Sequence, residues 1–181
     1  MSDDAPRHLV LVGLMGAGKS TVGARCAVRL GREFVDVDDV IVATAGRPVA
    51  DIFATDGEAV FRSLERRAIA DVCASPQPLV IACGGGAVLD AENRHRVQER
   101  GVVVWLTADP ATLADRVGGG PARKKRPLLA GDDAPVATLE RLATLRAPAY
   151  EAAAHAVVDT AGHRVDEVAE RVLEEYARCG G

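Results

Sequence analysis

With 181 residues and a net charge of −4 at pH 7, the chain is long enough to bury a core, and its charge argues against nucleic-acid binding by bulk electrostatics. Its 48% hydrophobic residues exclude an intrinsically disordered protein. The four cysteines are scattered without a C-x-x-C pair, so we expect packed, reduced thiols and no zinc site. No apolar run is as long as a membrane span, and residues 1–7 do not resemble a signal peptide. These features predict a cytoplasmic protein.

Five apolar segments are typical of buried strands. They are 8–13 (HLVLVG), 33–38 (EFVDVD), 78–83 (PLVIAC), 102–107 (VVVWLT) and 155–160 (HAVVDT). Residues 57–74 and 165–176 carry apolar positions at helical spacing. Apolar strands that alternate with helices predict a parallel sheet covered on both faces. Residues 117–133, rich in glycine, proline and basic side chains, are expected to form a mobile loop.

The first predicted strand leads into GLMGAGKS at 13–20, which fits the phosphate-binding pattern G-x-x-x-x-G-K-[ST]. Glycines let backbone N–H groups turn inward around an anion, and the following helix adds its positive N-terminal end. We expect Lys19 to contact the β- and γ-phosphates and Ser20 to bind Mg²⁺. The alternative is a chance match at an ordinary strand–helix turn. The segment predicts nucleoside triphosphate binding, and the sequence lacks the N-K-x-D motif usual in GTPases.

Two carboxylates, Asp36 and Asp38, stand at the end of the second predicted strand. Residues two apart in an extended chain face the same side, and ligands of an open parallel sheet bind beyond the carboxyl ends of its strands. Both side chains would then point into one cleft beside Ser20. One would hold a metal-bound water and the other would accept a proton from an attacking hydroxyl. Alternatively, Asp38 or Asp39 caps a helix that begins near Val40.

Three glycines, Gly84, Gly85 and Gly86, directly follow the third predicted strand. Three such residues favour close approach of a ligand to the backbone. A tight turn into a helix near Asp90 is the alternative, although one glycine would serve for that.

Two arginines, Arg62 and Arg146, are candidates for binding a small carboxylate, whose geometry the planar guanidinium matches. Each also has a structural interpretation. Arg62 has Glu58 and Glu65 as suitable surface partners on the same predicted helix. Arg146 would be a favourable cation near the C-terminus of a helix that a proline terminates.

Four consecutive basic residues occupy 123–126. We interpret Arg123, Lys124 and Lys125 as solvated charges. Arg126, which the segment RPLL anchors, is expected to move over the γ-phosphate, where it would neutralise charge in the transition state and exclude water.

Taken in order, the motifs GLMGAGKST, DVD, ADIFATDGEAVFRSLE, GGGA, RPLL and RAPAYE resemble the shikimate kinase family over nearly the whole chain. The resemblance implies an α/β fold of the P-loop NTPase, nucleoside-monophosphate-kinase-like type. Its five-stranded parallel sheet has the order 2-3-1-4-5, with flanking helices and a mobile lid. One domain over 1–181 would hold a substrate-binding helical region at about 36–65 and the lid at about 117–130. The implied reaction transfers phosphate from MgATP to the 3-hydroxyl of shikimate, a step of chorismate and aromatic amino-acid biosynthesis.

The resemblance also assigns roles by matching position. The implied ATP-binding residues are Gly16, Ala17, Gly18, Lys19, Ser20, Thr21, Arg116 and Arg126. The implied substrate-binding residues are Asp38, Arg62, Gly84, Gly85, Gly86 and Arg146, with Phe53 and Phe61 lining the pocket. A core role suits Phe61 equally well. The implied catalytic residues are Lys19, Asp38 and Arg126, and the implied Mg²⁺ ligands are Ser20 and, through water, Asp36.

Two features depart from the family pattern. The segment between Arg116 and Arg126 is a few residues longer than usual, which makes Arg123 a rival to Arg126. His163 stands where some relatives have an adenine-contacting arginine, and Arg164 is the alternative. The expected partners are shikimate and ATP, without nucleic acid or membrane, and the expected state is a monomer. Two rival functions stay open: another P-loop small-molecule kinase such as a gluconate kinase, and a non-catalytic nucleotide-binding module.

Overall fold

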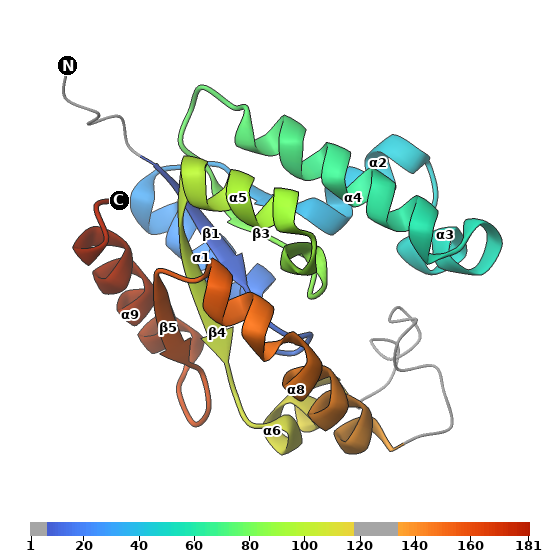
Figure 1. Cartoon of the computed structure of the whole chain (residues 1–181). Coiled ribbons are helices and arrows are strands. Elements are labelled where there is room, and N and C mark those ends of the chain that lie inside the picture. The colour runs from blue at the N-terminus through green and yellow to red at the C-terminus, as the bar shows by residue number, and fades with distance from the viewer. Residues whose placement is uncertain (1–6, 118–133) are drawn as a thin grey trace.

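A parallel sheet of five strands in the order β2-β3-β1-β4-β5 forms the centre of the fold (Figure 1). The computed structural model describes residues 7–117 and 134–181. The strands are β1 (His8–Val12), β2 (Phe34–Asp36), β3 (Val80–Ala82), β4 (Gly101–Thr107) and β5 (Ala156–Asp159). The predicted class, the strand order and all five strand segments are confirmed, with each strand end within two residues of its predicted place.

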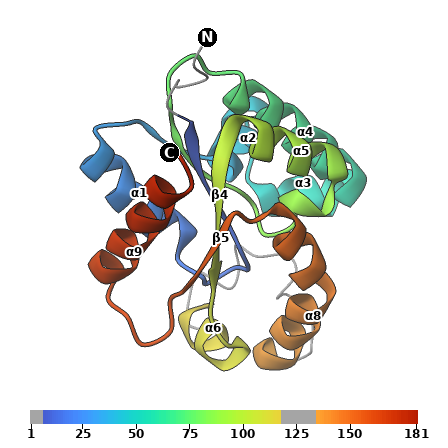
Figure 2. The ribbon, with the colours of Figure 1, turned by 60° about the vertical axis from the view of Figure 1, so that its left-hand side comes forward.

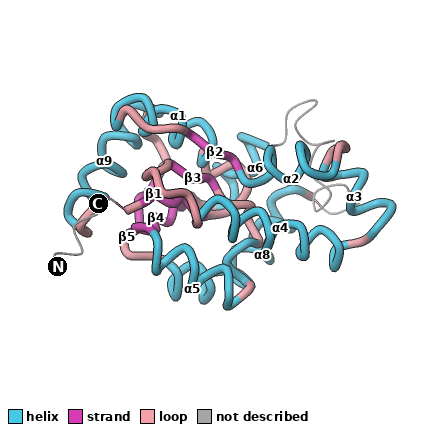
Figure 3. Tube along the Cα trace, turned by 90° about the horizontal axis from the view of Figure 1, so that it is seen from above, coloured by secondary structure: helices cyan, strands magenta, loops and turns pink. Residues whose placement is uncertain are grey.

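Helices cover both faces of this sheet (Figures 2 and 3). They are α1 (Lys19–Leu30), α2 (Val37–Ala45), α3 (Val49–Asp56), α4 (Glu58–Cys73), α5 (Ala91–Arg100), α6 (Pro110–Val117), α8 (Pro135–Ala153) and α9 (Val165–Arg178). Helices α1 and α9 lie side by side on one face, and α5 and α8 cover the other. Helices α2 and α3 pack against α4 beyond the β2 side of the sheet. In the ranges 7–117 and 134–181, no helix is both long and apolar enough to cross a membrane.

The central strand β1 explains why apolar runs predicted this architecture. All five of its residues are buried, because β3 pairs with it on one side and β4 on the other while helices cover both faces. Leu9 is paired with Val80 and with Val102, so the same register aligns the carboxyl ends of three strands. Cys26, Cys73 and Cys83 are buried free thiols, as expected for packing residues.

Helix α2 begins earlier than expected, which corrects the interpretation of the DVD segment. Strand β2 ends at Asp36, and Asp38 already lies in the first turn of the helix. The side chain of Asp36 is the N-cap, since its Oδ1 accepts a hydrogen bond from the Asp38 N–H at 3.0 Å. The prediction that Asp38 or Asp39 caps this helix was therefore wrong, as was the extended conformation of Asp38.

Helix α8 does not end at Pro148, contrary to the expectation for Arg146. The helix continues to Ala153, and Arg146 lies inside it. A proline within a helix leaves the carbonyl four residues earlier without its N–H donor. Pro148 and Thr144 both lie on the exposed side of the helix. Burial of Tyr150 and Ala153 beyond the proline offsets the lost bond.

Gly13 joins β1 to the phosphate-binding segment at a point where no side chain fits. Its φ is +142°, and a Cβ there would lie 2.3 Å from the carbonyl oxygen of Leu106 in β4. Gly31, the C-cap of α1, also has a positive φ of +62°, but a Cβ there would meet nothing within 4 Å.

We expect Gly13→Ala to lower the free energy of unfolding by more than about 2 kcal/mol, since the β4 backbone has to move. Gly31→Ala is the matched control and should cost only about 1 kcal/mol, because it meets conformational strain without a clash. Urea denaturation of both variants measures the difference. Equal losses in the two variants would contradict the close contact between Gly13 and β4.

Candidate active site

Two neighbouring cavities lie at the carboxyl edge of the sheet, one lined by segments that follow β1, β2 and β3 and the other by segments that follow β1 and β5. The loop cavity, of about 440 Å³, is lined chiefly by residues 16–22 and by Arg116, Thr160 and His163. The arginine cavity, of about 240 Å³, is lined by Asp36, Asp38, Arg62, Glu65, Gly84, Gly85, Gly86 and Arg146, among others. Lys19 and Ser20 line both cavities, so a ligand in one is a direct neighbour of a ligand in the other.

All six residues of 16–21, which the sequence singled out for binding phosphates, line the loop cavity. Gly16 and Gly18 have φ values of +82° and +92°, the left-handed conformations that fold this loop back on itself. The Lys19 ammonium donates to the carbonyl oxygens of Gly13 at 2.8 Å and Leu14 at 3.0 Å. Because α1 begins at Lys19, the positive end of that helix faces the same space.

The outer end of the loop cavity is held together by Arg116 from α6. Its guanidinium donates to the carbonyl oxygen of Gly16 at 3.2 Å and to that of Thr160 at 2.9 Å. His163 lines this cavity, whereas Arg164 is the N-cap of α9 and is not among the lining residues. Of the two candidates for this position, the fold therefore brings His163 to the cavity.

Ser20 and Asp36 meet at the boundary between the cavities. The Ser20 hydroxyl donates to Asp36 Oδ2 at 2.6 Å. The part of the chain that the structure describes holds no cluster of three or more His, Cys, Asp or Glu residues that could bind a metal by itself. A hydroxyl and one carboxylate beside a phosphate-binding loop suit Mg²⁺, which keeps several waters and takes phosphate oxygens as ligands. The donor set fits a metal ion that is shared with a nucleotide.

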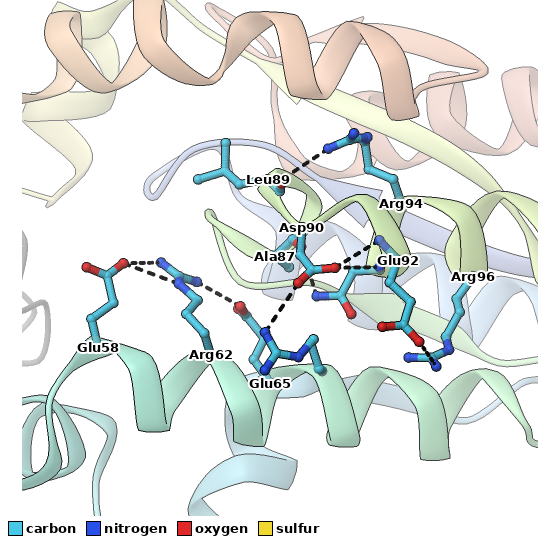
Figure 4. Close-up of polar contacts among 11 residues, drawn as sticks. Glu58, Arg62, Glu65, Ala87, Leu89, Asp90, Glu92, Arg94 and Arg96 are labelled. Atoms are coloured by element: carbon cyan, nitrogen blue, oxygen red, sulfur yellow. Dashed lines mark hydrogen bonds and ion pairs between the residues drawn. The ribbon is translucent and has the colours of Figure 1, made fainter.

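Arg62 and Arg146 meet in the arginine cavity from different helices, α4 and α8. Arg62 donates to Glu65 at 2.7 Å and to Glu58 at 3.1 Å, and Figure 4 shows these three side chains in a row along α4. The sequence suggested two surface partners, and Glu58 is one. Glu65 is also a partner of Arg62, as expected, but it is only 1% exposed, so the prediction that it lies at the surface was wrong. Position 65 lies on the side of α4 that faces Gly84, where the sheet edge excludes water.

Three buried polar atoms of the arginine cavity have no hydrogen-bond partner within residues 7–117 and 134–181. They are Asp38 Oδ1, Glu65 Oε1 and Arg146 Nε. Leaving such groups unsatisfied costs about 1–3 kcal/mol each, more when they are charged. A Cβ at Gly84 would lie 2.8 Å from Glu65 Oε1 and 3.2 Å from Asp38 Oδ1. The absence of side chains at the glycines thus leaves room for a polar ligand that would satisfy these atoms.

Asp38 has the electrostatic character of a base. Its pKa is raised from 3.8 to about 6, mainly by burial and further by the neighbouring carboxylates of Asp36 and Glu65. The Lys19 ammonium opposes this shift. The carboxylate is therefore more basic than an exposed aspartate and still ionised at neutral pH.

An apolar wall closes the other side of the arginine cavity. Phe53 of α3 and Phe61 of α4 both line it, with ring centroids 4.6 Å apart. Phe61 is 4% exposed and also belongs to the core, so both interpretations of this residue hold. The Arg62 guanidinium lies 5.2 Å from the centroid of its ring.

The comparisons with known proteins fit this geometry. The family described as Shikimate kinase (SKI) matches residues 15–177 of the chain. The chain belongs to the shikimate kinase family. A shikimate kinase of Symbiobacterium thermophilum is 46% identical over 96% of this chain and 98% of its own length. Among solved structures, the shikimate kinase of Acinetobacter baumannii in complex with shikimate has a TM-score of 0.88, with 35% identity over 94% of this chain and 93% of its own.

The gluconate kinase alternative shares the fold at a lower level. A gluconokinase from Sinorhizobium meliloti has a TM-score of 0.63 and 25% identity, over 97% of this chain and 94% of its own. The family match therefore separates this shikimate kinase family member from that rival, whereas the phosphate-binding loop alone does not.

Some residues expected at the site lie outside the described ranges, and two residues that were not predicted support it. Arg123, Arg126 and the lid beyond residue 117 lie outside the described residues. Sequence analysis missed Thr160, whose carbonyl anchors Arg116, and Tyr150, whose hydroxyl donates to the carbonyl oxygen of Gly85. Tyr150 stands in the segment RAPAYE four residues after Arg146, on the same helix face, a spacing that could have revealed it.

The raised pKa of Asp38 predicts that this residue costs stability at neutral pH. Between about pH 4 and 6 the folded protein keeps a proton that the unfolded chain releases, so the contribution of Asp38 to stability falls as the pH rises. We expect Asp38→Asn to be more stable than the parent at pH 7.5, by on the order of 1–3 kcal/mol.

The gain should shrink at pH 4.5, where much of Asp38 is protonated in the folded state. Asp39→Asn is the matched control, because it removes the same charge from an exposed neighbour on α2. Urea denaturation of the parent and both variants at the two pH values measures these differences. A gain for Asp38→Asn that does not depend on pH would contradict the electrostatic cause.

Proposed function

We propose that this chain transfers the γ-phosphate of ATP to the 3-hydroxyl of shikimate across the boundary between its two cavities. Membership of the shikimate kinase family supports the activity. The observation that supports one cavity for the nucleotide and the other for the acceptor is that Lys19 and Ser20 line both. A triphosphate that ends at these residues would place its last phosphate beside an acceptor in the arginine cavity.

On the nucleotide side, the backbone of 16–21 would bind the phosphates, and Lys19 would exchange its present carbonyl contacts for phosphate oxygens. Arg116 and His163 line the outer end, where the adenosine part of ATP would lie. Val165 and Val168 add apolar surface there, which suits a planar base.

We propose Mg²⁺ as the divalent ion, held by Ser20 directly and by Asp36 through water. When bound, this ion would neutralise part of the charge on the transferring phosphate. The hydroxyl–carboxylate contact at 2.6 Å would open to admit it. Asp36 would keep its second oxygen on the N-terminus of α2, so metal binding would not require the helix to move.

On the acceptor side, Arg62, Arg146 and the N–H groups of the glycine loop, which consists of Gly84, Gly85 and Gly86, would bind the carboxylate of shikimate. Asp38 would accept a hydrogen bond from the 3-hydroxyl and take its proton as the new O–P bond forms. Its otherwise unpartnered Oδ1 is the atom available for this contact in the described structure. Phe53 and Phe61 would cover the apolar face of the ring. We further propose a monomer in the cytoplasm as the working state.

The proposed function is tested by measuring ADP release with ATP and each of two acceptors, shikimate and gluconate, with and without Mg²⁺. We expect turnover with shikimate, dependence on the metal ion and no significant turnover with gluconate. ADP release with gluconate at the same rate as with shikimate would refute the assignment. So would the absence of turnover with either acceptor.

Replacing the proposed base should separate chemistry from nucleotide binding. We expect Asp38→Asn to lower kcat about 10²–10⁴-fold, the usual contribution of a general base, while the Kd for ATP changes little. Coupled assays and calorimetry with an ATP analogue measure the two quantities. Unchanged turnover in this variant would remove Asp38 from the mechanism.

Replacing either cavity arginine should weaken acceptor binding. Loss of one charged contact in Arg62→Ala or Arg146→Ala is expected to cost on the order of 2–4 kcal/mol in the Kd for shikimate. Arg67→Ala is the matched control, because this arginine lies exposed on the same helix as Arg62. If the control and Arg62→Ala bind shikimate equally well, the assignment of Arg62 is wrong.

A further inference from the structure

The glycine loop of the arginine cavity has all three of its carbonyl groups fixed. The Gly84 oxygen accepts a hydrogen bond from the Ala87 N–H at 3.0 Å, and the Gly86 oxygen accepts one from the Leu89 N–H at 3.1 Å. These two bonds are local to the turn that follows. The Gly85 oxygen is different, because it accepts from the hydroxyl of Tyr150 on α8, a helix distant in sequence.

The N–H groups of the same loop differ from its carbonyl groups. Nowhere in 7–117 or 134–181 does the N–H of Gly84, Gly85 or Gly86 have a hydrogen-bond acceptor. All three glycines line the arginine cavity. The Gly85 carbonyl and the Gly86 N–H belong to one planar trans peptide and point in opposite directions. The bond from Tyr150 therefore also fixes the direction of the Gly86 N–H, away from α8.

This restraint matters because consecutive glycines allow a peptide plane to flip at little steric cost. A flip would present a carbonyl oxygen where an N–H now stands, next to Arg62. Arg62 borders this residue, since a Cβ on Gly86 would lie 2.5 Å from Arg62 Nη2. An anionic ligand held by Arg62 would be repelled by the flipped carbonyl and attracted by the N–H.

Tyr150 is well placed to hold one orientation of this peptide. It is 1% exposed, and its ring packs on Trp105 of β4 with centroids 5.4 Å apart. Burial raises the pKa of Tyr150 to about 12, so the hydroxyl stays protonated and remains a donor. Arg146, one helical turn earlier, approaches the same loop, since a Cβ on Gly85 would lie 3.1 Å from its Nη1. One turn of α8 thus contacts the loop with both a guanidinium and a hydroxyl.

We infer that Tyr150 is a positioning residue for acceptor binding: its hydroxyl locks the Gly85–Gly86 peptide so that the Gly86 N–H joins Arg62 and Arg146 around the acceptor carboxylate. This inference rests on the proposed function, in which that carboxylate belongs to shikimate. Tyr150 acts through the Gly85 backbone and through its contact with Arg146, and it is not among the residues that line the arginine cavity.

The test is steady-state kinetics of Tyr150→Phe with shikimate and ATP varied separately. Tyr150→Phe removes the hydroxyl that donates to Gly85 and adjoins the Arg146 guanidinium. This loss is expected to raise the KM for shikimate by about five- to tenfold, with the KM for ATP and kcat changed less than about twofold. Tyr176→Phe is the matched control. Tyr176 is 2% exposed and its hydroxyl also donates to a carbonyl, that of Arg7, but it lies on α9 away from the cavity. Its KM values should be those of the parent.

Trp105 is the only tryptophan of the chain and packs on Tyr150, so its fluorescence reports whether the ring of residue 150 stays in place. We expect an unchanged emission spectrum in Tyr150→Phe. An altered spectrum with loss of the fold would mean that the hydroxyl is needed for packing and not for acceptor binding, and it would overturn the inference. So would an unchanged KM for shikimate, or equal rises in both KM values. A parent protein inactive toward shikimate would instead refute the proposed function and the inference with it.

Discussion

The active site depends on one constraint of parallel sheets, which is that all strands end at the same edge. The register of β3, β1 and β4 aligns their carboxyl ends. The segments that follow β1, β2 and β3 therefore all begin at this edge. The loop of 13–18, the start of α2 and the glycine loop therefore meet, although they are far apart in the sequence. Helices α4 and α8 then close this edge from the side, and each contributes one arginine to the lining of the arginine cavity.

The arginine cavity is electrostatically costly. Three carboxylates, two guanidiniums and the Lys19 ammonium line this small cavity, and the present hydrogen bonds satisfy only part of them. Burial raises the pKa of both Asp38 and Glu65, whereas Arg62 and Arg146 lower that of Glu65. Such a cluster lowers the stability of the protein until a ligand pairs with its unsatisfied polar atoms. Part of the stability of the fold is therefore exchanged for binding and catalysis.

Most of the fold and much of the site could be predicted from sequence, because those features are local. The apolar run of β1 and the glycine–lysine–serine pattern after it follow from nearest neighbours alone. The errors came where tertiary contacts override local preference. Asp36 ends β2 because its own side chain caps α2. Pro148 does not end α8, since Tyr150 and Ala153 are buried beyond it. Glu65 is buried because Gly84 packs against it, a contact between distant segments that no spacing encodes.

The shared wall of Lys19 and Ser20 also has a consequence for inhibitor design. A single molecule that joins an adenosine phosphate to a cyclohexene carboxylate would reach both cavities past Lys19 and Ser20. Once one half is bound, the other half is confined near its own subsite at a high effective concentration, and the two affinities reinforce each other. A short, stiff tether would gain most, because two adjacent residues line both cavities.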